Sequence, residues 1–370
     1  VGMSKGIGSS IGIIGGGWAG CAAAALLAQR GHAVTLLEAA PMLGGRARTL
    51  ETLDAPEPLD NGQHIAIGAY ADTLALLHSL GVAEGEAFYR MPFNLQRIDG
   101  TGLRFPDLPA PWNAALGILG AKGWRWRERL ALLRWAAAWQ LKGFRCAADF
   151  TLADITKNLP LTVQAQFITP LCLSALNTAV TEASAQVFLR VLRDAVFLFP
   201  KGSNFLLPKQ DLGALLPQAA AKAVQAAGGQ VHCGQRVLAV QKQGDAWQVQ
   251  TAEKAWHFSH VLLATPAWVA MELLKGLPQQ SSVCAALQSL EHRPIATVYA
   301  RSDKPLPAPM LALADSAEHP AQFVFDRSQL LACPEQGKGA LLAFVISLCQ
   351  LPPRELQAAV LQQAKTQLGL

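Results

Sequence analysis

The chain has 370 residues, of which 51% are apolar and 15% charged, and its formal net charge is +5 at pH 7. This composition excludes a disordered chain and supplies enough core for two domains or one large interleaved unit. Seven cysteines without a CxxC pair argue against a disulfide framework, and no uninterrupted apolar run reaches the roughly 18 residues of a spanning helix. We therefore expect a protein of a reducing compartment that does not cross a membrane.

Residues 11–37 predict a strand, a helix and a second strand. The run 11–14 is β-branched, an alanine-rich stretch continues to Arg30 and stops at Gly31, and 33–37 is again aliphatic. Two strands joined by a helix pair in parallel, so this stretch predicts a βαβ unit.

Three glycines between the first strand and the helix form a GxGxxG pattern. Gly15 permits the tight turn, Gly17 lets the backbone approach a pyrophosphate, and Gly20 lets the helix pack closely on the strand. The helix N-terminus adds amide donors. Glu38 ends the second strand, where its carboxylate can accept hydrogen bonds from ribose hydroxyls. The pattern predicts a dinucleotide site rather than a plain glycine-rich turn.

The residues after Glu38 indicate whether the cofactor is FAD or NAD. Gly44 and Gly45 expose backbone N–H groups, and the guanidinium of Arg46 can pair with phosphate. GxGxxG followed by GGR resembles the FAD-dependent amine oxidase and phytoene desaturase superfamily. That resemblance implies FAD as cofactor and an α/β fold, in which a Rossmann-like FAD-binding domain carries an inserted α+β substrate domain.

A basic, tryptophan-rich segment spans residues 111–145. From Lys122 to Arg145 seven cations stand against Glu128 alone, a local balance of +6. Apolar residues recur there at helical spacing: Leu130, Leu133, Ala137, Leu141 and Phe144. The pattern predicts a helix lying on a membrane surface. The alternative is a helix that packs this stripe on the substrate domain. We expect no nucleic-acid partner, because no nucleic-acid module accompanies the basic residues.

The sequence predicts four segments. Residues 1–104 and 200–266 form two parts of the FAD-binding domain. Residues 105–199 form a largely helical, membrane-facing substrate region, and residues 267–370 form the second part of the substrate domain. By resemblance, Arg236 and Val237 lie near the adenine, and an ordinary hairpin is the alternative. The superfamily normally finishes with a strand, a Gly-Asp pair and a helix. This chain ends in a helical pattern, so we expect the C-terminal part of the FAD domain to be missing.

Five longer sequence segments point to one family within this superfamily: residues 59–81, 105–113, 170–178, 182–197 and 206–217. Together they resemble the squalene-associated FAD-dependent desaturase family, the hydroxysqualene dehydroxylases, over nearly the whole chain. The resemblance implies removal of the allylic hydroxyl of hydroxysqualene with reduced FAD, giving squalene for hopanoid synthesis. We expect a cytoplasmic protein, peripherally associated with the inner face of the cell membrane and without a metal site.

The segment DNGQH at 60–64 crowds polar residues before an aliphatic strand. By resemblance four of its side chains project near the flavin ring: Asp60, Asn61, Gln63 and His64. Gly62 permits close backbone approach. We predict that His64 donates a proton to the departing hydroxyl, with Asp60 as its orienter or as a flavin contact. The alternative is a structural or merely flavin-adjacent histidine.

Asn177 and Thr178 are predicted to contact substrate in an apolar tunnel, and a helix-end cap explains them equally well. Cys172 is expected to be a packing residue rather than a nucleophile.

Other functions share much of this pattern. A carotenoid or phytoene desaturase runs hydride in the opposite direction, and a non-catalytic prenyl-lipid escort uses the same fold. An amine or protoporphyrinogen oxidase is disfavoured because only three tyrosines are present to build an aromatic cage.

Overall fold

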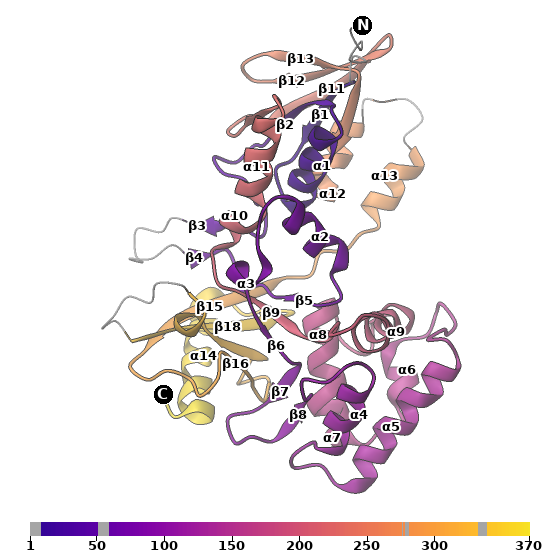
Figure 1. The fold of residues 1–370 in the computed structure, drawn as a ribbon, viewed down its shortest axis with the longest axis vertical. Coiled ribbons are helices and arrows are strands. Elements are labelled where there is room, and N and C mark those ends of the chain that lie inside the picture. Colours follow the sequence, from indigo (N-terminus) through magenta and orange to yellow (C-terminus); the bar gives the residue numbers. More distant parts are fainter. Residues whose placement is uncertain (1–8, 51–58, 276, 278–280, 332–338) are drawn as a thin grey trace, which may run out of the picture. The chain divides into compact units, whose positions relative to one another are not determined.

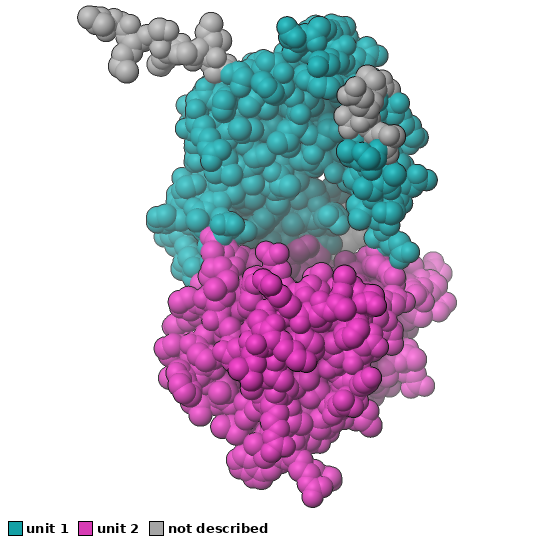
Figure 2. All heavy atoms as spheres, turned by 90° about the vertical axis from the view of Figure 1, so that its right-hand side faces the viewer, with its two compact units in different colours: residues 1–61, 72–87, 210–292 teal, residues 62–71, 88–209, 293–370 magenta. Residues whose placement is uncertain are grey.

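A computed structural model describes residues 9–50, 59–275, 277, 281–331 and 339–370. The chain divides into two compact units, coloured separately in Figure 2. Unit 1 comprises residues 1–61, 72–87 and 210–292, and unit 2 comprises residues 62–71, 88–209 and 293–370. Among the residues described, no helix combines the length and apolar character needed to cross a bilayer.

The chain passes from one unit to the other at positions that differ from the predicted boundaries at 104/105, 199/200 and 266/267. Strand pairing explains the largest difference. β9 (Phe205–Pro208) pairs with both β5 (Ala66–Ile67) and β6 (Phe88–Met91), so three stretches that the sequence assigns to the FAD-binding domain lie in unit 2.

Unit 1 is built on a four-stranded parallel sheet in the order β10-β2-β1-β14, of which β1 and β2 are labelled in Figure 1. Its strands are β1 (Ser10–Ile14), β2 (Ala33–Leu37), β10 (Gln230–His232) and β14 (His260–Leu263). Alternate side chains of β1 and β2 point to opposite faces. On one face they share a core with the alanine-rich helices α1 (Trp18–Gln29) and α11 (Pro217–Ala226). The predicted βαβ unit is thus present.

The opposite face of the sheet is covered by an antiparallel sheet of β11 (Val237–Gln243), β12 (Ala246–Thr251) and β13 (Ala255–Phe258). Ile14 and Leu37, the last residues of β1 and β2, pack into this second core. The other elements of unit 1 are β3 (Thr49–Leu50), β4 (Leu59–Asp60), α2 (Ala71–Ser79), α3 (Glu84–Ala87), α10 (Leu212–Leu215), α12 (Ala267–Leu274) and α13 (Ser281–Gln288).

Unit 2 combines antiparallel strands with a helical region. Its largest sheet has the order β15-β18-β17-β16, from β15 (Ile295–Ser302), β16 (Met310–Ala312), β17 (Phe323–Asp326) and β18 (Ala340–Ser347). α14 (Pro353–Leu368) packs on one face of this sheet through Leu356, Val360 and Ala364. A hairpin of β7 (Asn94–Gln96) and β8 (Gly102–Arg104) joins the sheet to the helices.

The helices of unit 2 share one core with these strands, centred on Phe93, Phe105, Phe167 and Phe205. They are α4 (Trp112–Leu119), α5 (Trp126–Leu141), α6 (Leu152–Thr156), α7 (Leu161–Val163), α8 (Thr169–Leu176) and α9 (Ala185–Leu192), with π-helical turns at Gln164–Ile168 and Arg193–Leu198 and a 3-10 turn at Arg327–Gln329.

Candidate functional site

The GxGxxG loop lies at the carboxyl ends of β1 and β2. Gly15 has a φ of +106°, which L side chains rarely adopt, and its N–H donates to the carbonyl of Leu37 at 2.8 Å. A Cβ on Gly20 would overlap the carbonyl oxygen of Gly15. α1 begins at Trp18 without a side-chain cap, so its first amides stay available to a ligand. The geometry supports the tight turn predicted at Gly15 and the close packing predicted at Gly20, and the pyrophosphate contact of Gly17 stays a prediction.

The second glycine pair meets the first backbone to backbone. Gly44 N–H donates to the carbonyl of Gly16 at 2.8 Å, and a Cβ on Gly45 would lie 3.1 Å from the Cα of Gly17. The indole of Trp18 donates to the carbonyl of Ala47 at 3.0 Å, which ties the loop to α1. Two motifs separated in sequence therefore form one surface of exposed backbone, which we call the glycine loops (Gly15–Gly20 and Gly44–Gly45).

Glu38 is held beside the glycine loops. One carboxylate oxygen accepts from the N–H of Gly16 at 2.5 Å and the other from the N–H of Ala40 at 2.7 Å. A carboxylate has roughly four acceptor sites, so two backbone bonds leave room for ribose hydroxyls. The ribose contact stays a prediction, and the structure adds a role in shaping the loop.

Arg46, which was predicted to pair with phosphate, and the nearby Arg48 differ in exposure and in hydrogen bonding. Arg46 is exposed, and its carbonyl accepts from the side-chain amide of Asn61 at 3.2 Å. Arg48 is half-buried, and its Nε is buried without a hydrogen-bond partner in the described part of the chain. Arg48 was not among the predicted site residues. Residues 44–47 form a turn, with the Ala47 N–H donating to the carbonyl of Gly44 at 3.1 Å, so sequence spacing does not tell which of the two arginines faces inward.

Polar atoms near the glycine loops fit a ligand with phosphate and hydroxyl groups. Thr265 lies beside Gly15, since a Cβ on Gly15 would be 3.2 Å from the Thr265 nitrogen. Gln235 N–H donates to the carbonyl of Glu38 at 2.8 Å. The Thr265 hydroxyl and the Gln235 side-chain oxygen are buried without partners among the described residues. Such groups are costly unless something bonds to them, so the residues present fit a dinucleotide.

Val237 begins β11 and is buried in the core that holds the ends of β1 and β2. Ligands of open α/β sheets bind outside these strand ends. The position agrees with the predicted adenine contact, which stays a prediction.

Asp60 is 5% exposed and supports a helix. Its carboxylate accepts from the N–H of Leu212 at 2.9 Å and from the Thr49 hydroxyl. Asp211 caps the same helix, α10, by accepting from Ala214 N–H at 2.9 Å. The predicted orienting or flavin role of Asp60 stays a prediction, beside a structural role that the structure makes plain.

Gly62, Gln63 and His64 form a tight turn against β15. The N–H of Gln63 donates to the hydroxyl of Thr297 at 3.1 Å, and a Cβ on Gly62 would lie 3.4 Å from that oxygen. His64 Nδ1 donates to the carbonyl of Gly62 at 2.8 Å. Because a carbonyl only accepts, Nδ1 carries the proton and Nε2 is the nitrogen left for other chemistry. Gln63 donates to the carbonyl of His64 at 3.0 Å, and its own side-chain oxygen is buried without a partner in the described residues.

Asn177 and Thr178 end a helix. Asn177 has a left-handed conformation at the end of α8, and its side-chain amide donates to the carbonyls of Arg293 and Pro294 at 3.2 and 3.3 Å. Its side-chain oxygen accepts from Leu348 N–H at 3.0 Å. The Thr178 hydroxyl donates to the carbonyl of Leu176 at 2.8 Å. The predicted alternative of a helix end is therefore present, and a substrate role for these side chains would compete with these bonds.

Cys172 is placed as predicted. Burial raises the pKa of Cys172 to about 11, and its thiol donates to the carbonyl of Thr178 at 3.2 Å, as expected of a packing residue. One of the other six cysteines, Cys333, lies outside the described residues.

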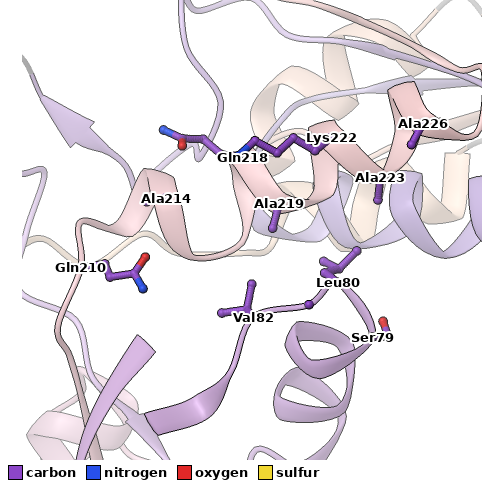
Figure 3. A pocket seen from close by; sticks show the side chains of 11 residues that line it. Ser79, Leu80, Val82, Gln210, Ala214, Gln218, Ala219, Lys222, Ala223 and Ala226 are labelled. Atoms are coloured by element: carbon purple, nitrogen blue, oxygen red, sulfur yellow. The ribbon is translucent and has the colours of Figure 1, made fainter. Parts of the chain in front are cut away.

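A hollow of about 530 Å³ lies in unit 1 between the end of α2 and helices α10 and α11 (Figure 3). Its polar side chains are Ser79, Gln210, Gln218 and Lys222, among alanines, Leu80 and Val82. None of the predicted site residues lines it.

A parallel sheet with glycine loops at its carboxyl edge is typical of a dinucleotide-binding fold. The family profile described as flavin containing amine oxidoreductase matches residues 18–369. The chain belongs to this family and is an FAD-dependent oxidoreductase, so the predictions of the superfamily and of FAD over NAD are confirmed.

Individual relatives agree with the family. A hydroxysqualene dehydroxylase of Rhodopseudomonas palustris is 27% identical over 300 residues, 75% of this chain and 66% of that protein. One of Sinorhizobium fredii is 25% identical over 314 residues, 80% of this chain and 69% of that protein. The chain thus spans about two thirds of the length of these relatives. The predicted resemblance to the hydroxysqualene dehydroxylases is confirmed.

Two further comparisons mark the wider superfamily. A 15-cis-phytoene desaturase of an Oncidium hybrid is 37% identical over 112 residues, 29% of this chain and 19% of that protein. The crystal structure of an oxidoreductase from Methanosarcina mazei has a TM-score of 0.73 at 16% identity, covering 96% of this chain and 84% of that one. At this identity the structure shows the shared fold alone, and it confirms the predicted fold class.

Proposed function

We propose that the chain reductively dehydroxylates hydroxysqualene to squalene. The observation that carries this proposal is the similarity, over 75% and 80% of the chain, to two proteins named hydroxysqualene dehydroxylase. The C–O bond of the allylic alcohol breaks as a proton joins the oxygen, and water leaves. Reduced FAD supplies the hydride that forms the new C–H bond.

Unit 1 contributes the backbone that holds the cofactor. The amides at the start of α1 and the N–H groups of the glycine loops would hold the pyrophosphate, and the field of the helix N-terminus favours its negative charge. Glu38 would hold the ribose, and the guanidinium of Arg48, whose Nε is buried without a partner in the described residues, would be available to the cofactor as a further donor.

Unit 2 contributes the proton donor. The bond from Nδ1 to the carbonyl of Gly62 fixes the His64 ring, and in the cationic ring Nε2–H faces outward to donate to the leaving hydroxyl. The buried side-chain oxygen of Gln63 accepts from the same hydroxyl and orients it.

Product analysis tests the proposal. The photoreduced protein is incubated without oxygen with hydroxysqualene, squalene or phytoene, and the lipids are extracted and identified by mass spectrometry. We expect squalene from hydroxysqualene and no change in the other two. Dehydrogenation of phytoene by the oxidised protein, with hydroxysqualene untouched, would instead establish a desaturase. A flavin-free preparation that binds prenyl lipids would establish an escort protein.

A further inference from the structure

Helix α5 is attached to unit 2 by one face. Leu132 and Trp139 are buried, and Trp135 lies between them along that face. The indole of Trp135 donates to the carbonyl of Ile155 at 2.8 Å. Trp124, just before the helix, is buried and donates to the side chain of Gln166 at 2.8 Å. Three of the five tryptophans in the basic segment are therefore structural.

The opposite face of α5 carries a second apolar stripe, and it is exposed. Trp126, Leu130, Ala137 and Leu141 follow one another at helical spacing, and Trp126 is 64% exposed, Leu130 42% and Leu141 90%. Of the stripe predicted from sequence, only Phe144, beyond the helix, is fully buried. The alternative that this stripe packs on the substrate domain is thus wrong for Leu130, Ala137 and Leu141.

Two neighbouring elements pack beside the first turns of α5. α4 and α7 lie beside α5 (Figure 1). The guanidinium of Arg129 donates to the carbonyl of Ala121 at 2.7 Å, and the hydroxyl of Thr162 donates to the carboxylate of Glu128 at 2.6 Å, which fixes both neighbours. They add three exposed apolar side chains: Trp112 (67%), Leu116 (48%) and Leu161 (81%).

Positive charge surrounds these apolar side chains. Six cations between residues 122 and 145 are exposed: Lys122, Arg125, Arg127, Arg134, Lys142 and Arg145. The seventh, Arg129, is turned inward by its backbone bonds. Glu128 is the only acid among residues 122–145, and its carboxylate accepts from Arg125 N–H and Thr162. The next acids along the chain are Asp149 and Asp154.

We infer that this basic aromatic face, made of the exposed residues of α4 and α5 named above with the exposed cations of residues 122–145, binds the surface of an anionic lipid bilayer. Tryptophan and leucine side chains enter the boundary between headgroups and acyl chains, while arginines and lysines pair with lipid phosphates. Its charge argues against pairing with the same face of a second copy, because two surfaces with a balance of +6 repel each other. A nucleic acid would use the cations and leave the exposed leucines without a partner.

Binding to vesicles tests the inference without any lipid substrate, so its outcome is independent of the proposed reaction. The whole chain is sedimented with phosphatidylcholine vesicles that contain or lack phosphatidylglycerol. We expect binding only when the anionic lipid is present. Changing Arg125, Arg127 and Arg134 together to Gln should weaken it roughly a hundredfold, about fivefold for each cation.

The apolar part of the face is tested by a double variant, Trp126→Ser with Leu130→Ser. It should weaken vesicle binding at least about tenfold, because the inserted apolar area is lost. Quenching of tryptophan fluorescence by brominated lipid should also fall in Trp126→Phe, a change that keeps the side chain apolar. All of these positions are exposed, so thermal unfolding of each variant should match the parent.

A matched control changes exposed residues of α14 in the same unit: Arg354→Gln, Lys365→Gln and Leu361→Ser. This variant should bind vesicles like the parent. Three results would overturn the inference: equal binding to uncharged vesicles, equal loss in the α14 variant, or binding to a duplex oligonucleotide but to no vesicle.

Discussion

The glycine loops of unit 1 offer backbone groups to a ligand, whereas the turn at 62–64 in unit 2 offers a side chain. In the loops, Gly15, Gly20 and Gly45 approach other backbone so closely that any Cβ would meet it. In the turn, the Gln63 N–H, the Gln63 side-chain amide and His64 Nδ1 bond within unit 2, while the Gln63 side-chain oxygen is buried without a partner among the described residues. In the proposed function, cofactor binding would therefore depend on the absence of side chains, and proton transfer would depend on a single side chain.

The sharpest way to break this comparison is Gly20→Ala. The added methyl group would meet the carbonyl oxygen of Gly15, which belongs to the backbone and cannot rotate away. We expect a loss of about 3 kcal/mol in the free energy of unfolding and protein purified without flavin. Flavin absorbance and urea unfolding measure both effects.

Gly31→Ala is the control for this change. Gly31 also has a positive φ, +87°, but no atom lies within 4 Å of its added Cβ. We expect a smaller loss of about 1 kcal/mol and a full flavin content. Full flavin in Gly20→Ala would refute the role given to the loops.

His64→Gln tests the other side of the comparison. The exposed ring makes one bond, to its own turn, so the stability of the variant should match that of the parent. Reoxidation of the reduced flavin by hydroxysqualene should slow at least about a hundredfold, because a general acid is lost. Stopped-flow absorbance measures the rate. An unchanged rate would leave His64 a structural residue, which was the alternative reading of the sequence.

Two substitutions of Asp60 distinguish a structural role of its carboxylate from a catalytic role. Asp60→Ala leaves the buried N–H of Leu212 without its acceptor and should cost about 2 kcal/mol in urea unfolding. Asp60→Asn keeps an oxygen at that place and should cost less. If instead Asp60→Asn kept full stability and lost turnover, the carboxylate would belong to the chemistry.

The smallest effect concerns Cys21, in the first turn of α1. Burial, then Glu38 and Cys233, raise the pKa of Cys21 from 9.0 to about 12. The folded chain therefore keeps a proton that the unfolded chain loses, so stability falls as pH rises above 9. Between about pH 8 and about pH 10 the parent should lose about 1.5 kcal/mol more than Cys21→Ala. Equal losses would contradict this.

The glycine loops were predictable because their constraints are local. Spacing of glycines after a strand, and the steric limits on φ, specify where backbone must approach backbone. The partners of Asp60 and Asn177 were not predictable. Leu212 is 152 residues from Asp60, and Arg293 is 116 residues from Asn177, so tertiary packing alone decides which backbone groups these side chains satisfy.

Helix α5 shows a different limit of prediction from sequence. Its period of apolar residues predicted a helix, and the structure has one at Trp126–Leu141. Two apolar stripes run along it, and sequence spacing does not tell which of them faces inward. The structure places Leu132 and Trp139 inside and leaves Leu130 and Leu141 exposed.

One measurement tests the central claim most directly. The flavin bound to this chain is photoreduced without oxygen, mixed with hydroxysqualene, and followed by the return of the oxidised flavin band, while squalene is quantified in the same sample. The account predicts full return of the band and equal amounts of squalene and reoxidised flavin. A flavin that stays reduced with hydroxysqualene present, or returns without squalene, would contradict it.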